Sequence, residues 1–209
     1  MMTIEIRSAK KSERDIIYNL MQDYLHEFSA FSDVEKDSDG LYQYPYLDFY
    51  WGDPSRFPFL IRTTDNQQEN SAGIVHRGSS SVTDSGNPEL SSGIIAGFAL
   101  LRSEFDPLTG LPGMEVSEFF VLPAYRNQGI GNAAAVKLWD QFPGQWTVRV
   151  LKANKAALPF WQHAIRRYTG GNYRETANST LNESNITFIF ENPFKDDLPP
   201  DIEPELLDY

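Results

Sequence analysis

The segment from Val121 to Ala135, V-L-P-A-Y-R-N-Q-G-I-G-N-A-A-A, constrains this chain more than any other. An apolar strand ends where it begins, a short loop follows, and Gly129 and Gly131 open an alanine-rich helix. Free backbone N–H groups and the helix dipole make such a helix N-terminus attractive to anions. Glycine lacks the Cβ that would hold phosphate oxygens away from the backbone, and Arg126 and Gln128 offer further donors. The segment therefore predicts a pyrophosphate site.

Two better-known phosphate-binding motifs fit this segment less well. The run from Gly129 to Ala134 matches G-x-G-x-x-A, but a dinucleotide-binding fold needs its glycines directly after the strand, and residues 122–128 intervene. That fold also needs an acidic residue at the end of the next strand, which here ends at Leu151 and Lys152. A Walker loop requires G-K-[ST], which does not occur in the sequence.

The rest of the chain alternates strand and helix patterns. Apolar alternation and apolar runs predict strands at residues 3–7, 57–62, 93–101, 114–121, 145–151, 172–176 and 186–190. Apolar residues at three- and four-residue spacing predict a helix that ends at Phe28, with Ser12 and Asp15 as a capping pair. Two more helices are expected at about 129–142 and 154–168. We therefore expect an α/β (α+β) fold with a mixed, mostly antiparallel sheet flanked by helices.

Composition excludes several kinds of chemistry. The sequence has no Cys, which excludes disulfides, thiolate metal sites and thiol nucleophiles. Its three His lie far apart in no metal-ligand spacing, so we expect no metal. A net charge of -11 disfavours nucleic-acid binding through a basic face. No export signal or stretch of transmembrane length is visible, so we expect a cytoplasmic protein without membrane partners.

We expect one domain over residues 1–194, interrupted by an insertion. Residues 63–92 are rich in Ser, Asn, Gly and Asp and predict a long polar loop. Residues 195–209 are acidic and predict a flexible tail. The aromatic run from Leu41 to Trp51 has no clean periodicity. It is interpreted as a loop or short helix that closes over the core, or else as one wall of a substrate pocket.

The stretch V-L-P-A-Y-R-N-Q-G-I-G resembles the acetyl-CoA signature of the GNAT superfamily of N-acetyltransferases, an Arg or Gln followed by x-x-G-x-Gly or Ala after a strand ending in Val-x-Pro. Downstream, Asn154 to Trp161 (N-K-A-A-L-P-F-W) is similar to the family's second motif. The order of predicted elements also resembles the family's: strand, helix, three strands, signature helix, strand, helix and two strands. The resemblance covers most of residues 3–193, and the stretches Y-P-Y-L-D-F-Y-W and E-F-F-V look like an uncharacterised branch of predicted acetyltransferases.

This resemblance implies acetyl-CoA as a co-substrate and a sheet that is splayed at the acetyl-CoA site. Backbone N–H groups of residues 128–131 would hold the pyrophosphate, and the strand end at residues 119–121 would pair with the pantetheine arm. The expected cofactor-binding residues are Phe119, Phe120, Val121, Arg126, Asn127, Gln128, Gly129, Ile130, Gly131, Asn132, Asn154, Phe160 and Trp161.

An amine must be neutral to attack a thioester, and an alkyl ammonium has a pKa of about 10, so a base must remove its proton. Glu118 and Glu115, on the strand before the signature loop, are the candidate catalytic residues. Strand alternation places them on opposite faces unless a bulge intervenes, so at most one is expected to face the thioester. We favour Glu118, because an acid in an otherwise apolar strand needs a reason. A structural salt bridge or backbone hydrogen bond is the alternative.

The general acid for the leaving thiolate is harder to assign. Many members of the family that the chain resembles use a Tyr in the second motif, where this sequence has Trp161, whose indole does not usefully release a proton. Another hydroxyl (Tyr125, Tyr168 or Tyr173), water, or departure without an acid all stay open.

The sequence thus predicts an N-acetyltransferase that acetylates a primary amine, on a small molecule or a peptide, by direct attack in a ternary complex. The alternative is a non-catalytic acyl-CoA-binding or regulatory protein on the same fold. A third reading, an interaction module, would use the loop at 63–92. The identity of the amine and the oligomeric state, monomer or homodimer, stay open.

Overall fold

The computed structural model describes residues 3–64, 93–105, 110, 112–179 and 184–192. Its strands are β1 (Thr3–Ser8), β2 (Arg56–Thr64), β3 (Ile94–Phe105), β4 (Pro112–Val121), β5 (Gln145–Leu151), β6 (Tyr173–Ser179) and β7 (Ser184–Glu191). Its α-helices are α1 (Arg14–Phe28), α2 (Ile130–Trp139) and α3 (Ala157–Thr169). The predicted elements occur in the predicted order. Strand β2 continues to Thr64, two residues into the predicted insertion, and residues 65–92 lie outside the described residues, as does the predicted tail at 195–209.

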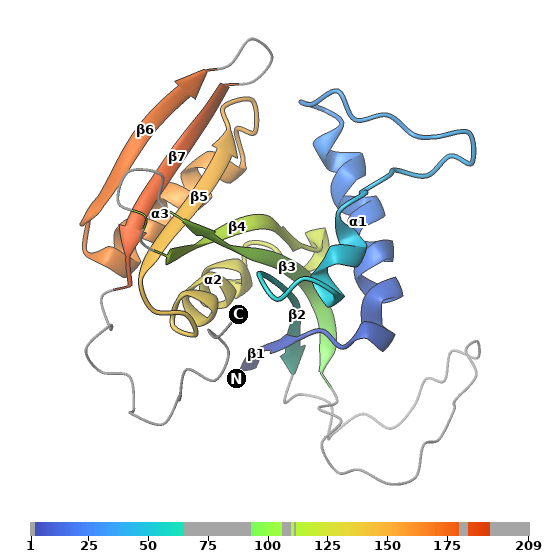
Figure 1. Ribbon diagram of the computed structural model, residues 1–209, viewed down its shortest axis with the longest axis horizontal. Helices are drawn as coiled ribbons and strands as arrows, with labels where there is room; N and C mark the ends of the chain where they lie inside the picture. The colour runs from blue at the N-terminus through green and yellow to red at the C-terminus, as the bar shows by residue number, and fades with distance from the viewer. Residues whose placement is uncertain (1–2, 65–92, 106–109, 111, 180–183, 193–209) are drawn as a thin grey trace, which may run out of the picture.

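The seven strands form a single sheet in the order β1-β2-β3-β4-β5-β7-β6 (Figure 1). Neighbouring strands are antiparallel except for β4 and β5, which run parallel. The expected mixed, mostly antiparallel sheet is therefore confirmed. The helix between the two parallel strands is α2, the signature helix, so the crossover itself positions the predicted anion site beside the centre of the sheet.

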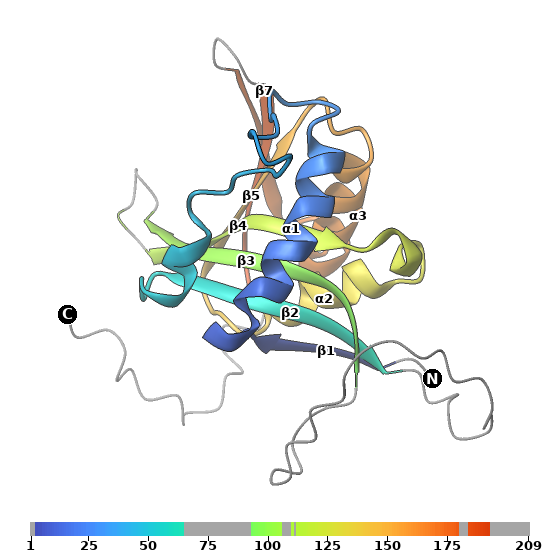
Figure 2. The same cartoon turned by 90° about the vertical axis from the view of Figure 1, so that its right-hand side faces the viewer.

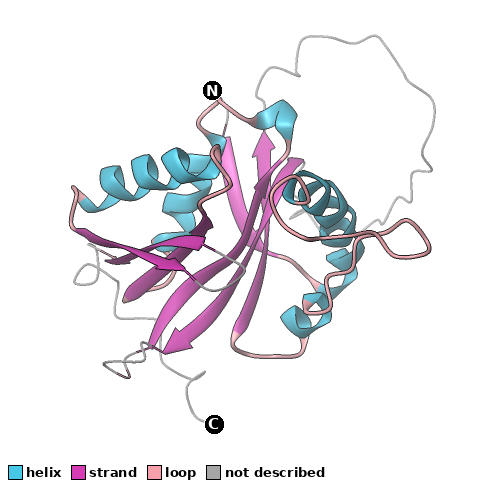
Figure 3. Cartoon of the chain, turned by 90° about the horizontal axis from the view of Figure 1, so that it is seen from above, coloured by secondary structure: helices cyan, strands magenta, loops and turns pink. Residues whose placement is uncertain are grey.

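Helices cover both faces of this sheet (Figure 3). Helix α1 crosses β2, β3 and β4 on one face (Figure 2), where Ile17 and Met21 are fully buried in a cluster with Phe98. Helices α2 and α3 pack on the other face, with Trp139 and Ile165 fully buried. Each buried large apolar side chain contributes about 1.5–3 kcal/mol, so these two clusters hold the helices on the sheet. None of the helices in the described part of the chain is long and apolar enough to cross a membrane.

Strand β4 contains a β-bulge at Ser117. Two consecutive residues of β3 pair with Val116 and then with Glu118, so Ser117 lies opposite no residue of that strand. The bulge reverses the alternation of side chains along β4. Glu115 faces the α1 side before the bulge and Glu118 faces the same side after it. The expectation of opposite faces is therefore wrong for this strand, because the bulge named as its exception is present.

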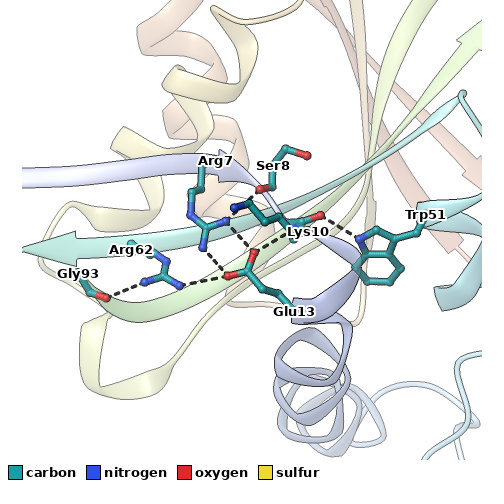
Figure 4. A network of polar contacts seen from close by, with 8 residues as sticks. Arg7, Ser8, Lys10, Glu13, Trp51, Arg62 and Gly93 are labelled. Atoms are coloured by element: carbon teal, nitrogen blue, oxygen red, sulfur yellow. Dashed lines mark hydrogen bonds and ion pairs between the residues drawn. The ribbon is translucent and has the colours of Figure 1, made fainter. Parts of the chain in front are cut away.

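An ion-pair network, and not the expected Ser12–Asp15 pair, fixes the start of α1 (Figure 4). The Glu13 carboxylate accepts hydrogen bonds from the Arg7 guanidinium and, at 3.0 Å, from the backbone N–H of Lys10. Arg62 of β2 lies 3.4 Å from the same carboxylate. The hydrogen bond from Arg7, the Lys10 N–H and the nearby positive charges lower the pKa of Glu13 to about 2. One carboxylate thus joins β1, β2 and the beginning of α1.

The aromatic run ends in a 3-10 helix, Leu47–Trp51. Leu47 and Tyr50 are buried under α1, and the Trp51 indole donates a 2.9 Å hydrogen bond to the carbonyl of Ala9. The expected short helix that closes over the core is therefore present. Tyr44, just before it, reaches the carboxylate of Glu118.

Candidate functional site

Strands β4 and β5 separate partway along their length. They pair only from Gly113 with Gln145 to Val116 with Val148, although β4 continues to Val121 and β5 to Leu151. Strand β5 instead pairs with β7 along its whole length. The edge of β4 that faces β5 is therefore unpaired beyond Val116. Two cavities open at this splay.

The larger cavity has a volume of about 390 Å³. Ten of the expected cofactor-binding residues line it: Phe119, Phe120, Val121, Arg126, Asn127, Gly129, Gly131, Asn132, Asn154 and Phe160. The other three, Gln128, Ile130 and Trp161, do not line it. The side chain of Ile130 is fully buried in the core, which leaves only its backbone at the helix N-terminus.

The N-terminus of α2 forms one end of the larger cavity. Gly129 has a left-handed φ of +79° as the N-cap residue, and no side chain caps the helix. The first bond of the helical ladder runs from the Ala133 N–H to the Gly129 carbonyl, at 3.0 Å. The preceding N–H groups, residues 128–132, have no acceptor among the described residues. The Oδ1 atom of Asn132 is buried there without a hydrogen-bond partner. Unpaired donors at a helix N-terminus favour an anion.

Gly131 brings α2 close to α3. A Cβ at this position would lie 3.2 Å from the Phe160 ring, tighter than ordinary contact. Phe160 in turn stacks on Phe119 of β4, with ring centroids 6.0 Å apart. The second glycine of the signature therefore allows the two helices to meet beside the end of β4, in addition to exposing backbone.

The side chains of Arg126 and Gln128, which the sequence suggests as additional anion donors, both make hydrogen bonds within the protein. Arg126 Nε donates to the Val121 carbonyl at 2.7 Å, and its Nη2 lies 2.9 Å from both carboxylate oxygens of Glu27 on α1. The Gln128 amide donates to the Ala124 carbonyl at 2.8 Å. Both side chains stabilise the loop that presents the helix N-terminus. The backbone N–H groups are left as the main anion donors.

The second motif begins with a capping residue. The Asn154 carboxamide oxygen accepts a 3.0 Å hydrogen bond from the Ala157 N–H at the start of α3, and the residue lines both cavities. Trp161, only 6% exposed, lines the smaller cavity and packs against Phe119 and Phe160. Its position is that of a packing residue.

Glu118 lines the smaller cavity, whose volume is about 250 Å³ and which lies along the splay. The hydroxyls of Tyr24 and Tyr44 donate hydrogen bonds to its carboxylate. Burial raises the pKa of Glu118 to about 7, and the charge of Glu115 adds to the increase, while the two tyrosine hydrogen bonds oppose it. A carboxylate with this pKa is a suitable general base near neutral pH.

Glu115 has a different environment, although it faces the same side of β4. Its carboxylate lies 2.5 Å from Arg102 of β3 and 2.6 Å from Arg149 of β5, and Arg149 also pairs with Glu104. The residue is 7% exposed and does not line either cavity. These ion pairs connect β3, β4 and β5 where β4 and β5 are still paired, so the contacts of Glu115 hold strands together and do not border a cavity.

Helix α1 forms a wall of the larger cavity that the sequence did not predict. Tyr24, Glu27 and Phe28 line the larger cavity, together with Phe31 just beyond the helix. The apolar periodicity of α1 is that of an ordinary core-facing helix. The sequence carries no signal that one end of this face borders a cavity.

The described residues thus combine a mixed α/β fold, a splayed sheet and a helix N-terminus with unpaired N–H groups, the arrangement expected of an α/β acyltransferase. The model of the acetyltransferase (GNAT) family matches residues 18–164, which is more than half of the chain. The chain therefore belongs to the GNAT family of acetyltransferases. A comparison with curated protein sequences finds no match.

Solved structures show the same fold at low sequence identity. The chain is similar to the ribosomal-protein-S18-alanine N-acetyltransferase of Escherichia coli (TM-score 0.53, 14% identity, covering 91% of this chain and 94% of that one). It is also similar to the spermidine N-acetyltransferase of Vibrio cholerae, solved with CoA and spermine (TM-score 0.53, 10% identity, 90% and 95%). A third is NAA60 of Arabidopsis thaliana, solved with acetyl-CoA (TM-score 0.52, 13% identity, 90% and 98%).

Proposed function

We propose that this protein transfers an acetyl group from acetyl-CoA to a primary amine, by direct attack of the amine in a ternary complex. The observation that carries the proposal is the meeting of two cavities at the splay. One ends at the free N–H groups of α2, and the other contains Glu118 with a pKa raised to about 7. Tyr24, Phe119 and Asn154 line both cavities, so an anionic cofactor in one would lie beside a base in the other.

The residues of the larger cavity fit acetyl-CoA. Unpaired N–H groups at residues 128–132 match the oxygens of a pyrophosphate. The edge of β4 beyond Val116 lacks a strand partner, which suits an extended arm with amide groups. The bound cofactor supplies the activated acetyl group. The apolar side chains of Val121, Phe119 and Phe160 line this cavity and would pack against the bound cofactor.

Glu118 performs the proton chemistry of the acceptor. An ammonium group with a pKa of about 10 must lose a proton before its nitrogen can attack. The Glu118 carboxylate accepts this proton, directly or through one water, and its raised pKa brings it closer to that of the amine. The neighbours that acetylate spermidine and a protein alanine support an amine as the acceptor. The amine itself stays unidentified, and the cytoplasmic location, a homodimer and the absence of nucleic-acid partners stay predictions.

The test begins with calorimetric binding of acetyl-CoA. We expect the native protein to bind and two variants to lose affinity: Gly129→Glu with Gly131→Glu, and the nearly isosteric Asn132→Asp, which adds charge where Oδ1 is buried without a partner. The matched control is Gly52→Glu, which adds the same side chain at a position with open space around it, and this variant should bind acetyl-CoA normally. Native protein that does not bind acetyl-CoA would contradict the proposal.

An amine panel follows, with release of free CoA as the readout. Glu118→Gln should bind acetyl-CoA like the native protein but turn over an accepted amine about 10²–10⁴-fold more slowly. Tight acetyl-CoA binding with no turnover on any amine would favour the alternative function, a non-catalytic acyl-CoA-binding protein.

A further inference from the structure

Amine acetylation leaves a thiolate that needs a proton, and the hydroxyls expected from the sequence do not supply it. The Tyr168 hydroxyl donates a 2.8 Å hydrogen bond to Asp140 and lies 3.1 Å from the side-chain oxygen of Asn192, away from both cavities. Tyr125 and Tyr173 do not line either cavity. Among the described residues that line the larger cavity, the single hydroxyl is that of Tyr24 on α1.

Tyr24 lies at the junction of the two cavities. It lines both of them, and its hydroxyl donates a hydrogen bond to the Glu118 carboxylate. Its ring is fixed by edge-on contacts with Phe98 and Phe120, at centroid distances of 6.0 and 5.8 Å. A rigid ring holds the hydroxyl beside the base and at the wall of the cofactor cavity.

We propose, resting on the function proposed above, that the Tyr24 hydroxyl is the general acid of the reaction and exchanges its proton with Glu118. The Glu118 carboxylate accepts the proton that leaves the amine nitrogen. The Tyr24 hydroxyl gives its proton to the sulfur as the carbon–sulfur bond breaks and the carbon–nitrogen bond is complete. The proton on Glu118 then passes along the hydrogen bond to the Tyr24 oxygen. One proton moves from nitrogen to sulfur, and both side chains return to their starting states.

The electrostatics of the pair agree with this sequence of steps. Burial raises the pKa of Tyr24 well above its usual value, and the charges of Glu118 and Tyr44 add to the increase, so the hydroxyl is protonated before reaction. An isolated phenol of this kind would give up its proton reluctantly. The adjacent protonated Glu118 restores that proton, so the hydroxyl does not have to remain a phenolate in an apolar site.

Tyr44 provides a matched control. Its hydroxyl also donates a hydrogen bond to Glu118, but the residue does not line either cavity. Tyr24→Phe and Tyr44→Phe therefore both perturb the base by the loss of one hydrogen bond, and each preserves the ring that packs in the core. Only Tyr24→Phe removes a proton donor from the cofactor cavity.

The test uses free CoA as the probe and needs no amine. Thiolate absorbance of CoA bound to each protein is followed against pH. A hydroxyl that donates to the sulfur stabilises the thiolate, so Tyr24→Phe should raise the pKa of the bound thiol by about one unit, whereas Tyr44→Phe should leave it unchanged. With an amine found in the panel, Tyr24→Phe should lower kcat about 10²-fold at every pH, while the loss in Tyr44→Phe should recover as pH rises.

The outcomes separate the two proposals. Native protein that does not bind CoA removes the proposed function, and the role of Tyr24 with it. Normal CoA binding with the same thiol pKa in native protein and Tyr24→Phe overturns the role of Tyr24 alone. Equal shifts in Tyr24→Phe and Tyr44→Phe also overturn it, since the effect would then pass through Glu118.

Discussion

Replacement of Glu118 by Gln should stabilise the fold above pH 7 while it removes the proposed base. The pKa of Glu118 rises from an ordinary value of about 4.5 to about 7, mainly through burial. The folded protein therefore binds the proton more tightly than the unfolded chain does. The ionised carboxylate begins to cost stability as pH rises above about 4.5, and the cost is complete above pH 7.

The size of this cost follows from the pKa difference. About 2.5 pKa units at 1.36 kcal/mol each give an upper limit near 3 kcal/mol. Because Glu118 is only partly buried and borders a cavity, we expect about 1–2 kcal/mol. Gln still accepts hydrogen bonds from Tyr24 and Tyr44, so the variant removes the charge while the contacts are retained.

Urea unfolding at pH 8 and at pH 4 measures this effect. Glu118→Gln should unfold at a higher midpoint than native protein at pH 8, and the two should agree at pH 4, where the native carboxyl is protonated in both states. Glu115→Gln serves as the control on the same face of β4. It removes the ion pairs with Arg102 and Arg149 together with the buried charge, so its unfolding midpoint at pH 8 should rise less than that of Glu118→Gln. A Glu118→Gln variant that is less stable than native protein at pH 8 would refute the reasoning.

Two further predictions concern the scaffold. Glu13→Gln should lower the free energy of unfolding by about 1–2 kcal/mol at pH 7, because the Glu13 carboxyl has a pKa of about 2 in the folded protein. This stabilisation is present above pH 4.5 and is lost as pH falls toward 2. Acid unfolding measures it, with Asp23→Asn as the control, because Asp23 is an exposed carboxylate on α1 whose replacement should have no effect. Gly97→Ala should lower the free energy of unfolding by more than about 2 kcal/mol, because its Cβ would lie 2.0 Å from the Phe120 carbonyl oxygen. Thermal unfolding should show little change for the control Gly52→Ala, whose Cβ meets open space. Equal stability of the two variants would contradict the clash.

The sequence was sufficient to predict the elements and most of the residues that gather around the end of β4 and the start of α2. Gly129 and Gly131 follow a strand and open a helix, and this local pattern alone predicts where free N–H groups occur. Ten of the expected cofactor-binding residues do line the larger cavity. A local pattern of this kind can be recognised in the sequence because it depends only on residues that are neighbours in the chain.

The remainder of the site depends on contacts between distant residues. Arg126 in the signature loop meets Glu27 on α1, and Tyr24 and Tyr44 meet Glu118, across separations that no spacing rule describes. The apolar stripe of α1 predicts burial but not which residues border a cavity. Unpaired residues at a bulge are also invisible in a single strand, because Ser117 has no distinguishing property in the sequence.

The bulge at Ser117 divides β4 into two stretches, and the set of residues that faces α1 changes from one stretch to the other. Odd-numbered residues face α1 before it and even-numbered residues do so after it. Strict alternation counted from Glu115 would therefore place every side chain from Glu118 to Val121 on the wrong face of the sheet. Deletion of Ser117 would restore regular pairing, with Val116 opposite Leu101 and Glu118 opposite Leu100, so Glu118 would still face α1. The extra residue thus allows two carboxylates three positions apart in the sequence, Glu115 and Glu118, to lie on the same side of the sheet.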